Sequence, residues 1–128
     1  MAGGSCLCRK VQYQILTELI EVTHCHCVTC RKAHASAFSS VAMIDVDEFS
    51  LMGEEHLSSY ESSPGKHRYF CSSCGSQIYA KRDNKHYIVL RLGTLDEPID
   101  NREKEHIWVS EKAHWYSLER SLPMKPEF

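Results

Sequence analysis

The feature that most constrains this chain is the placement of its seven cysteines. They fall into three short clusters, which we call the first pair (Cys6 and Cys8), the central trio (Cys25, Cys27 and Cys30) and the second pair (Cys71 and Cys74). Seven is an odd number, so a complete set of disulfides would leave one thiol over. Soft thiolates select Zn²⁺ or iron–sulfur clusters over hard cations, and the clustering therefore favours metal binding.

The spacing within the clusters fits metal ligation. Residues i and i+2 of a strand point to the same face, so each Cys-x-Cys can aim both sulfurs at one ion. The second pair lies in Cys-Ser-Ser-Cys-Gly, which is the pattern of a metal-binding knuckle. A structural zinc is enclosed by four ligands, whereas a catalytic zinc keeps one position open.

Two divisions of the seven thiols follow from the spacing. In the first, the first and second pairs close one four-cysteine site, and the central trio holds a second ion whose fourth position is open. In the other, Cys27 and Cys30 join the second pair around a single zinc, leaving three cysteines free. A redox or disulfide role is a third alternative.

Composition bounds the class of protein. The 128 residues suffice for one domain, residues 1–128, with an ordered core expected over about residues 3–120. The net charge of -2 includes no basic cluster, so nucleic acid is not an expected partner. The longest apolar runs are far shorter than a membrane span requires, and the N-terminus has no signal-peptide pattern. We therefore expect a cytoplasmic protein without a membrane partner.

Short strands separated by turn signals predict a mainly β fold. Val11, Tyr13 and Ile15 alternate as on a half-buried strand. The segment 29–37 is compatible with a short helix or an irregular turn, and Ser62-Ser63-Pro64-Gly65 is a turn. Trp115 and Tyr116 are expected to pack against the domain near the C-terminal end of the chain. The further predicted strands cover 20–27, 38–44, 49–52, 77–81, 86–92 and 105–109.

The chain resembles the glutathione-dependent formaldehyde-activating (GFA) enzymes, a family that includes centromere-protein-V-like proteins. The resemblance covers nearly the whole chain and has three cysteine motifs in the same order. It rests on Gly4-Ser5-Cys6-Leu7-Cys8, Cys25-His26-Cys27-Val28-Thr29-Cys30-Arg31-Lys32, Ser63-Pro64-Gly65, Arg68, Phe70-Cys71-Ser72-Ser73-Cys74-Gly75-Ser76, Gly93-Thr94-Leu95-Asp96, His106-Ile107-Trp108 and Trp115.

This resemblance implies a small Mss4-like β domain with two Zn²⁺ per chain. It implies a structural zinc on the first and second pairs and a catalytic zinc on the central trio, which favours the first division of the thiols. The family usually has Cys-His-Cys-Gly at the first motif, where this chain has Leu7 and Arg9. Because arginine tolerates a positive φ poorly, this departure puts the backbone of the first knuckle in doubt.

Three thiolates make zinc electron-rich, which suits a sulfur ligand better than water activation. The resemblance implies a carbon–sulfur lyase or synthase that forms or cleaves S-(hydroxymethyl)glutathione, with glutathione as the small-molecule partner. A non-catalytic zinc domain that binds a protein and a thiol- or metal-sensing module are the alternatives. The sequence does not indicate an oligomeric state.

Candidate substrate-binding residues are less distinctive. Arg31, Lys32 and Arg68 could pair with substrate carboxylates, although each also fits an ordinary surface cation. His106 and Trp108 could line a pocket or simply pack. His26 lies between two cysteines, and we expect it to face away from them in a solvated or supporting role.

Overall fold

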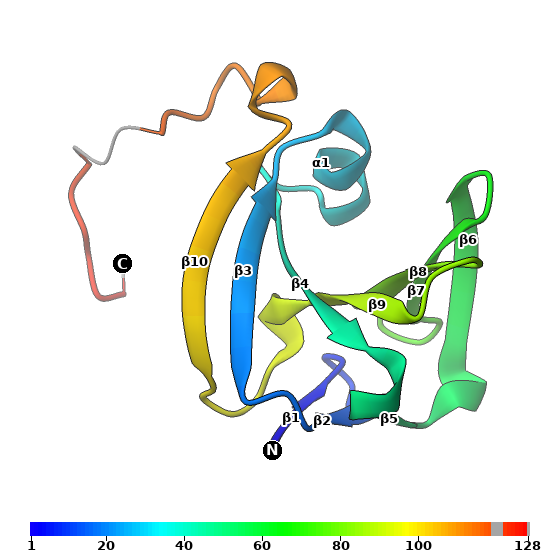
Figure 1. Cartoon of the computed structure of the whole chain (residues 1–128). Helices are drawn as coiled ribbons and strands as arrows, with labels where there is room; N and C mark the ends of the chain where they lie inside the picture. Colours follow the sequence, from blue (N-terminus) through cyan, green and yellow to red (C-terminus); the bar gives the residue numbers. More distant parts are fainter. Residues whose placement is uncertain (119–121, 128) are drawn as a thin grey trace.

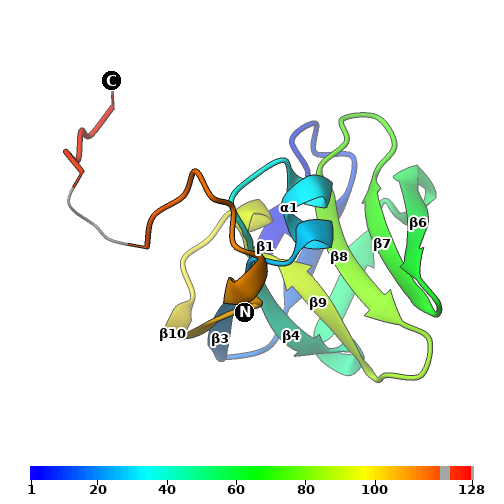
Figure 2. The ribbon, with the colours of Figure 1, turned by 90° about the horizontal axis from the view of Figure 1, so that it is seen from above.

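The computed structural model describes residues 1–118 and 122–127. Within them, a three-stranded sheet has the strand order β1-β2-β5, and a seven-stranded sheet has the order β10-β3-β4-β9-β8-β7-β6 (Figures 1 and 2). The strands are β1 (Ala2–Ser5), β2 (Gln12–Ile15), β3 (Leu19–Cys25), β4 (Ser39–Asp45), β5 (Phe49–Met52), β6 (Leu57–Ser63), β7 (Lys66–Cys71), β8 (Gln77–Arg82), β9 (Tyr87–Arg91) and β10 (Asp100–Ile107). The predicted mainly β single domain is confirmed.

Short helices join these strands. The α-helix α1 (Val28–His34) follows β3, and the 3₁₀ helices are η1 (Val46–Glu48), η2 (Glu54–His56), η3 (Leu92–Thr94) and η4 (Val109–Glu111). No helix in the described ranges has both the length and the apolar character that a membrane crossing requires.

Strand pairing is antiparallel except at one edge of the larger sheet. There β10 runs parallel to β3, with Ile107 opposite Cys25 and His106 opposite His24. Figure 1 shows these two strands side by side, with α1 next to their upper ends. A parallel pair needs a long connection, and here the rest of the sheet lies between the two strands in sequence. The last long strand therefore lies against the segment that leads into the central trio.

The hydrophobic core confirms the alternation read in the sequence. Val11, Tyr13 and Ile15 are buried, and β2 carries the latter two on one face. Ile44, from β4 of the larger sheet, belongs to the same cluster. Period-2 burial of large side chains fixes the register of this strand, because a one-residue slip would expose them.

The central segment resolves into a helix. β3 ends at Cys25, two residues before the predicted limit, because Cys27 is the N-cap of α1. The Cys27 sulfur accepts a hydrogen bond from the Cys30 backbone N–H over 3.3 Å. The helix ends at Ala35, whose φ of 50° is left-handed, as is usual at a helix C-terminus.

Three strands lay outside the prediction, namely β1, β6 and β7. β1 reads Ala-Gly-Gly-Ser and β6 reads Leu-Ser-Ser-Tyr-Glu-Ser-Ser, and neither has the apolar alternation of a half-buried strand. The glycines of β1 are required by close packing, since a Cβ on Gly4 would lie 2.2 Å from the Tyr13 ring. Neighbouring strands impose β1 and β6.

Of the two C-terminal aromatic residues expected to pack, one does so. Tyr116 lies with its ring centroid 5.5 Å from that of Phe38. The expectation for Trp115 is wrong, because its side chain is 63% exposed. Residue 120, the expected end of the ordered core, lies outside the described residues.

We predict that Tyr13→Phe destabilises the domain, because the Tyr13 hydroxyl links β2 to η3 through a 2.7 Å hydrogen bond to Thr94 Oγ1. Losing one buried hydrogen bond costs about 1 kcal/mol of unfolding free energy. Chemical denaturation measures this loss. Tyr60→Phe is the matched control, because Tyr60 is exposed and its substitution should leave the midpoint unchanged. Equal midpoints for the wild type and Tyr13→Phe would contradict the prediction.

Candidate metal centres and the adjoining cavity

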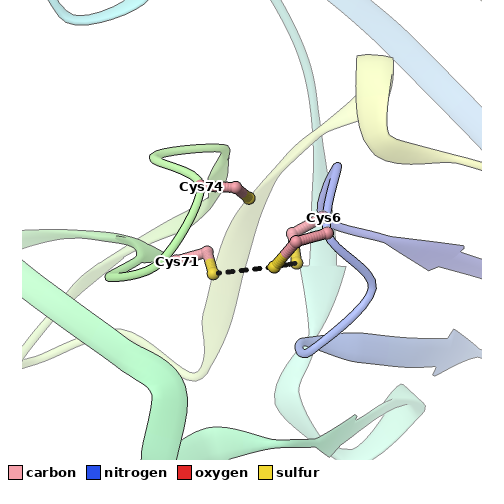
Figure 3. Close-up of side chains that lie close together, drawn as sticks. Cys6, Cys71 and Cys74 are labelled. Carbon is pink, nitrogen blue, oxygen red and sulfur yellow. Dashed lines mark hydrogen bonds between the residues drawn. The ribbon is translucent and has the colours of Figure 1, made fainter.

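The first and second pairs meet although 63 positions separate Cys8 from Cys71. Cys6 and Cys8 follow β1, Cys71 ends β7, and Cys74 lies in the turn before β8. Figure 3 shows the sulfurs of Cys6, Cys71 and Cys74 gathered from these separate segments. All four sulfurs of the two pairs lie within 4.8 Å of one another. We call this group the four-cysteine site.

The sulfur spacing at the four-cysteine site fits a tetrahedral zinc. Zn–S bonds of about 2.3 Å place neighbouring sulfurs of a tetrahedron roughly 3.8 Å apart. The Cys8 sulfur lies 3.6 Å from that of Cys6 and 3.7 Å from that of Cys71. The Ser76 hydroxyl lies 3.3 Å from the Cys74 sulfur, and hydrogen bonds from this hydroxyl and from backbone N–H groups lower the pKa of Cys74 to about 5. The donor set therefore suits a soft divalent ion held as thiolates.

Each knuckle of this site closes with a backbone hydrogen bond to the carbonyl of its first cysteine. The Gly75 N–H donates to the Cys71 carbonyl over 2.8 Å, and the Arg9 N–H donates to the Cys6 carbonyl over 3.0 Å. Gly75 has a φ of 81°, and Arg9 has a φ of 66°. The first knuckle thus keeps the left-handed conformation that glycine favours, although an arginine occupies the position.

The central trio comes from one segment of six residues. Cys25 ends β3, Cys27 caps α1, and Cys30 lies in the first turn of that helix. Their three sulfurs also lie within 4.8 Å of one another. Cys25 and Cys30 are buried, whereas Cys27 is partly exposed. The segment thus presents three soft ligands together.

Hydrogen bonds to β10 hold this segment in place. The His26 N–H donates to the Ile107 carbonyl over 3.0 Å, and His26 Nε2 lies 2.8 Å from His106 Nδ1. His26 is fully buried, so of the two roles expected for it the solvated one is excluded and the supporting one agrees with the structure. Its ring packs 4.9 Å from that of Phe38. His26 and His106 therefore support the trio segment from the side.

A cavity of about 440 Å³ adjoins the central trio, and all three cysteines contribute to its wall. Val41, Val89 and Ile107 supply apolar surface, and the exposed Trp108 also lines it. Four cations and two carboxylates complete its charged wall, namely Lys66, Arg82, Arg91, Lys104, Glu21 and Glu105. Lys104 and Glu21 pair with each other over 3.5 Å. The cavity has the size and mixed lining of a small-molecule site.

Two buried arginines lie close to the trio. Arg68, on β7, and Arg91, on β9, are each only 4% exposed. Arg68 Nη2 lies 3.9 Å from the Cys30 sulfur, and its Nε donates to Ser62 Oγ over 2.9 Å. Its Nη1, and the Nε and Nη2 of Arg91, are buried with no hydrogen-bond partner among the described residues. The interpretation of Arg68 as a surface cation is therefore wrong.

Burial and mutual charge shape the protonation of this region. The Cys25 thiol donates to Cys30, which lowers the pKa of Cys30 and raises that of Cys25, and the charge of Arg68 lowers the pKa of Cys30 further. Burial lowers the pKa of Arg91 to about 10, so it remains protonated at pH 7. Burial and the nearby arginines lower the pKa of Lys66.

Of the remaining candidate substrate residues, only Trp108 lines the cavity. It is 58% exposed, with a left-handed φ of 58°. Arg31 and Lys32 lie on α1 and are not part of the cavity wall. His106 contacts His26 instead of the cavity. Sequence reasoning missed Lys66 and Arg91, and the available signal for Arg91 was a charged residue inside the apolar run 87–92.

Comparison with known proteins agrees with this architecture. A Podospora anserina protein named "Putative glutathione-dependent formaldehyde-activating enzyme" is 31% identical over 118 residues, which cover 88% of this chain and 50% of that protein. The chain thus spans about half the length of this curated relative. The crystal structure of a Rhodobacter sphaeroides protein superposes with a TM-score of 0.62 at 19% identity, covering 78% of this chain and 99% of that one, and so shares the fold.

The family assignment comes from the sequence as a whole. Residues 1–111 match the family described as "Glutathione-dependent formaldehyde-activating enzyme". The matched range includes both pairs, the central trio and nearly all of the cavity's elements. With its cysteine clusters assembled as described, this chain belongs to the glutathione-dependent formaldehyde-activating (GFA) family.

Proposed function

We propose that this chain is a zinc-dependent carbon–sulfur lyase or synthase that forms or cleaves S-(hydroxymethyl)glutathione. One observation carries the proposal: three cysteine sulfurs lie together in the wall of a cavity large enough for a small ligand. A domain that used its metal only for scaffolding would need the four-cysteine site alone. Family membership supports glutathione and formaldehyde as the reactants.

We assign one zinc to each cysteine group. The four-cysteine site supplies a complete tetrahedral set and links two distant segments, which suits a structural ion. The central trio supplies three ligands and leaves one position for a substrate. When bound there, zinc supplies a soft Lewis-acidic position that favours a thiolate over a thiol.

The residues of the cavity position and select the substrate. Lys66 and Arg82 are placed to pair with glutathione carboxylates, because both lie in the wall and carry positive charge. The apolar side chains of Val41, Val89 and Ile107 exclude water from the region beside the trio. Trp108 covers part of the same wall. These roles replace a direct contact from Arg31, Lys32 or His106.

Magnitudes indicate that positioning supplies most of the rate. A free thiol with a pKa near 8.5 is a few per cent ionised at pH 7, so full ionisation gains roughly 30-fold. Lowering its pKa by about 2 units returns roughly tenfold through weaker nucleophilicity. Holding the sulfur and carbon atoms in reacting geometry offers a much larger gain. Cleavage benefits further, because a lower thiol pKa makes a better leaving group.

The cytoplasm is the compartment we propose. All seven cysteines are free thiols in the structure, and a thiolate ligand set survives best where disulfides are kept reduced. Glutathione is also a thiol of reducing compartments.

We predict unequal roles for the two cysteine groups. Cys74→Ser removes a ligand that joins distant segments, and structural zinc contributes about 10–16 kcal/mol of apparent binding free energy in small peptides. This exceeds or equals the stability of a typical domain, so the variant should be strongly destabilised and poor in metal. The central trio spans only six residues, so its loss does not disconnect distant segments. The Cys30→Ser variant should therefore stay folded with one zinc. Metal analysis and thermal melts measure both. Equal destabilisation of the two variants would argue against this division.

We also predict that the wild type accelerates the exchange of formaldehyde between its free form and its glutathione adduct. Exchange NMR with ¹³C-formaldehyde at pH 7 measures the rate, and Cys30→Ser should reduce it to the uncatalysed value. Val28→Ala, an exposed substitution in the same helix, is the matched control and should keep full activity. A wild-type rate no faster than the buffer rate would refute the proposed activity.

A further inference from the structure

The two buried arginines near the central trio have a role that family membership does not specify. Arg68 and Arg91 reach this region from different strands, β7 and β9. Among the described residues, neither forms an ion pair with a carboxylate. Charges that are nine-tenths buried destabilise a fold unless something compensates them. The compensating negative charge must therefore come from the sulfurs beside them or from a ligand.

We infer that Arg68 and Arg91 form a charge-selecting pair that makes the cavity favour a ligand with a negatively charged sulfur over a neutral ligand of similar size. This inference rests on the proposed function and deepens it. The selected class is thiols that bind as thiolates. Neutral donors such as imidazole are the disfavoured class.

Geometry places the action of the pair at the sulfur end of the substrate. Arg68 Nη2 faces the Cys30 sulfur at 3.9 Å, and Arg91 lines the same cavity as the three cysteines. The unpartnered nitrogens are too deeply buried for a substrate carboxylate to reach them from the cavity. They act through space in a region of low dielectric, where Coulomb interactions are strong. The substrate carboxylates are bound instead by Lys66 and Arg82, which are more accessible from the cavity.

The balance of charges at the site also favours an anionic sulfur ligand. Three thiolates exceed the charge of one divalent ion by a single negative charge. An anionic sulfur ligand raises that excess to two, and the guanidinium groups of Arg68 and Arg91 match it. A neutral ligand leaves one of the buried guanidinium charges uncompensated. The pair therefore stabilises the anionic complex selectively.

The test measures ligand affinity on cobalt-substituted protein, without turnover. Sulfur-to-cobalt charge-transfer absorption reports thiolate binding, and the d–d bands report imidazole. We expect Arg91→Gln to weaken glutathione on the order of tenfold or more, because one nearby charge is lost in a low dielectric. Imidazole affinity should change less than twofold. Arg82→Gln is the comparison variant: Arg82 lines the same cavity but is exposed, and its loss should act only through the glutathione carboxylates.

A second ligand identifies which negative charge Arg91 senses. Glutathione diethyl ester keeps the thiol but lacks both carboxylate charges. Arg91→Gln should weaken the ester by the same factor as glutathione, whereas Arg82→Gln should weaken only glutathione. A loss confined to glutathione would show that Arg91 senses carboxylates and would overturn the inference. An equal loss for imidazole would overturn it too, as would wild-type protein that binds no thiol.

Stability and turnover separate the remaining explanations. Arg91→Met replaces the charge with an apolar chain of similar length, and its thermal midpoint in the metal-free protein should not fall below that of the wild type. A lower midpoint together with lost cobalt would mean a structural role and would contradict the inference. If the affinities follow the prediction but formaldehyde exchange is not accelerated, then the charge-selecting pair stands and the proposed activity fails.

Discussion

The meeting of the first and second cysteine pairs is the constraint on which the rest of the fold depends. It ties the end of β1 to the turn between β7 and β8 across 63 positions of sequence. The smaller sheet includes β1, whereas β7 and β8 belong to the larger sheet. An ion held there would fix the two sheets against each other. The Leu7 N–H also donates to Ser76 Oγ, so the two knuckles remain in contact through the protein itself.

The central trio depends on a different part of the molecule. Its segment is short, so it gains little order from ligation and needs support from outside. That support comes from the parallel pair β3–β10, where His26 bonds to Ile107 and to His106. The cavity wall is then completed from β4, β7 and β9. The larger sheet therefore builds the site, and the four-cysteine site holds the sheet in place.

Local patterns in the sequence were sufficient for some elements and not for others. Alternation predicted β2, because it depends on neighbours in sequence. Spacing left two divisions of the seven cysteines open, and the family resemblance favoured the division that the structure assembles. β1 could not be predicted, since its glycines have no periodicity and its pairing with β2 decides its conformation. Lys66 and Arg91 are 25 positions apart, and only the sheet order places both on one cavity. Residues that act by burial and long-range charge leave little signal in a single sequence.

The two cysteine groups also differ in the charges that surround them. The sulfurs of the four-cysteine site lie among neutral hydrogen-bonding groups such as the Ser76 hydroxyl and the Val11 backbone N–H. The central trio lies beside two buried guanidinium groups. Protonation of Cys30 would leave the nearby guanidinium of Arg68 without a compensating negative charge. Arg68 thus lowers the pKa of Cys30, and a thiolate at Cys30 in turn compensates part of the buried positive charge. Ligand selection and local stability therefore arise from the same charges.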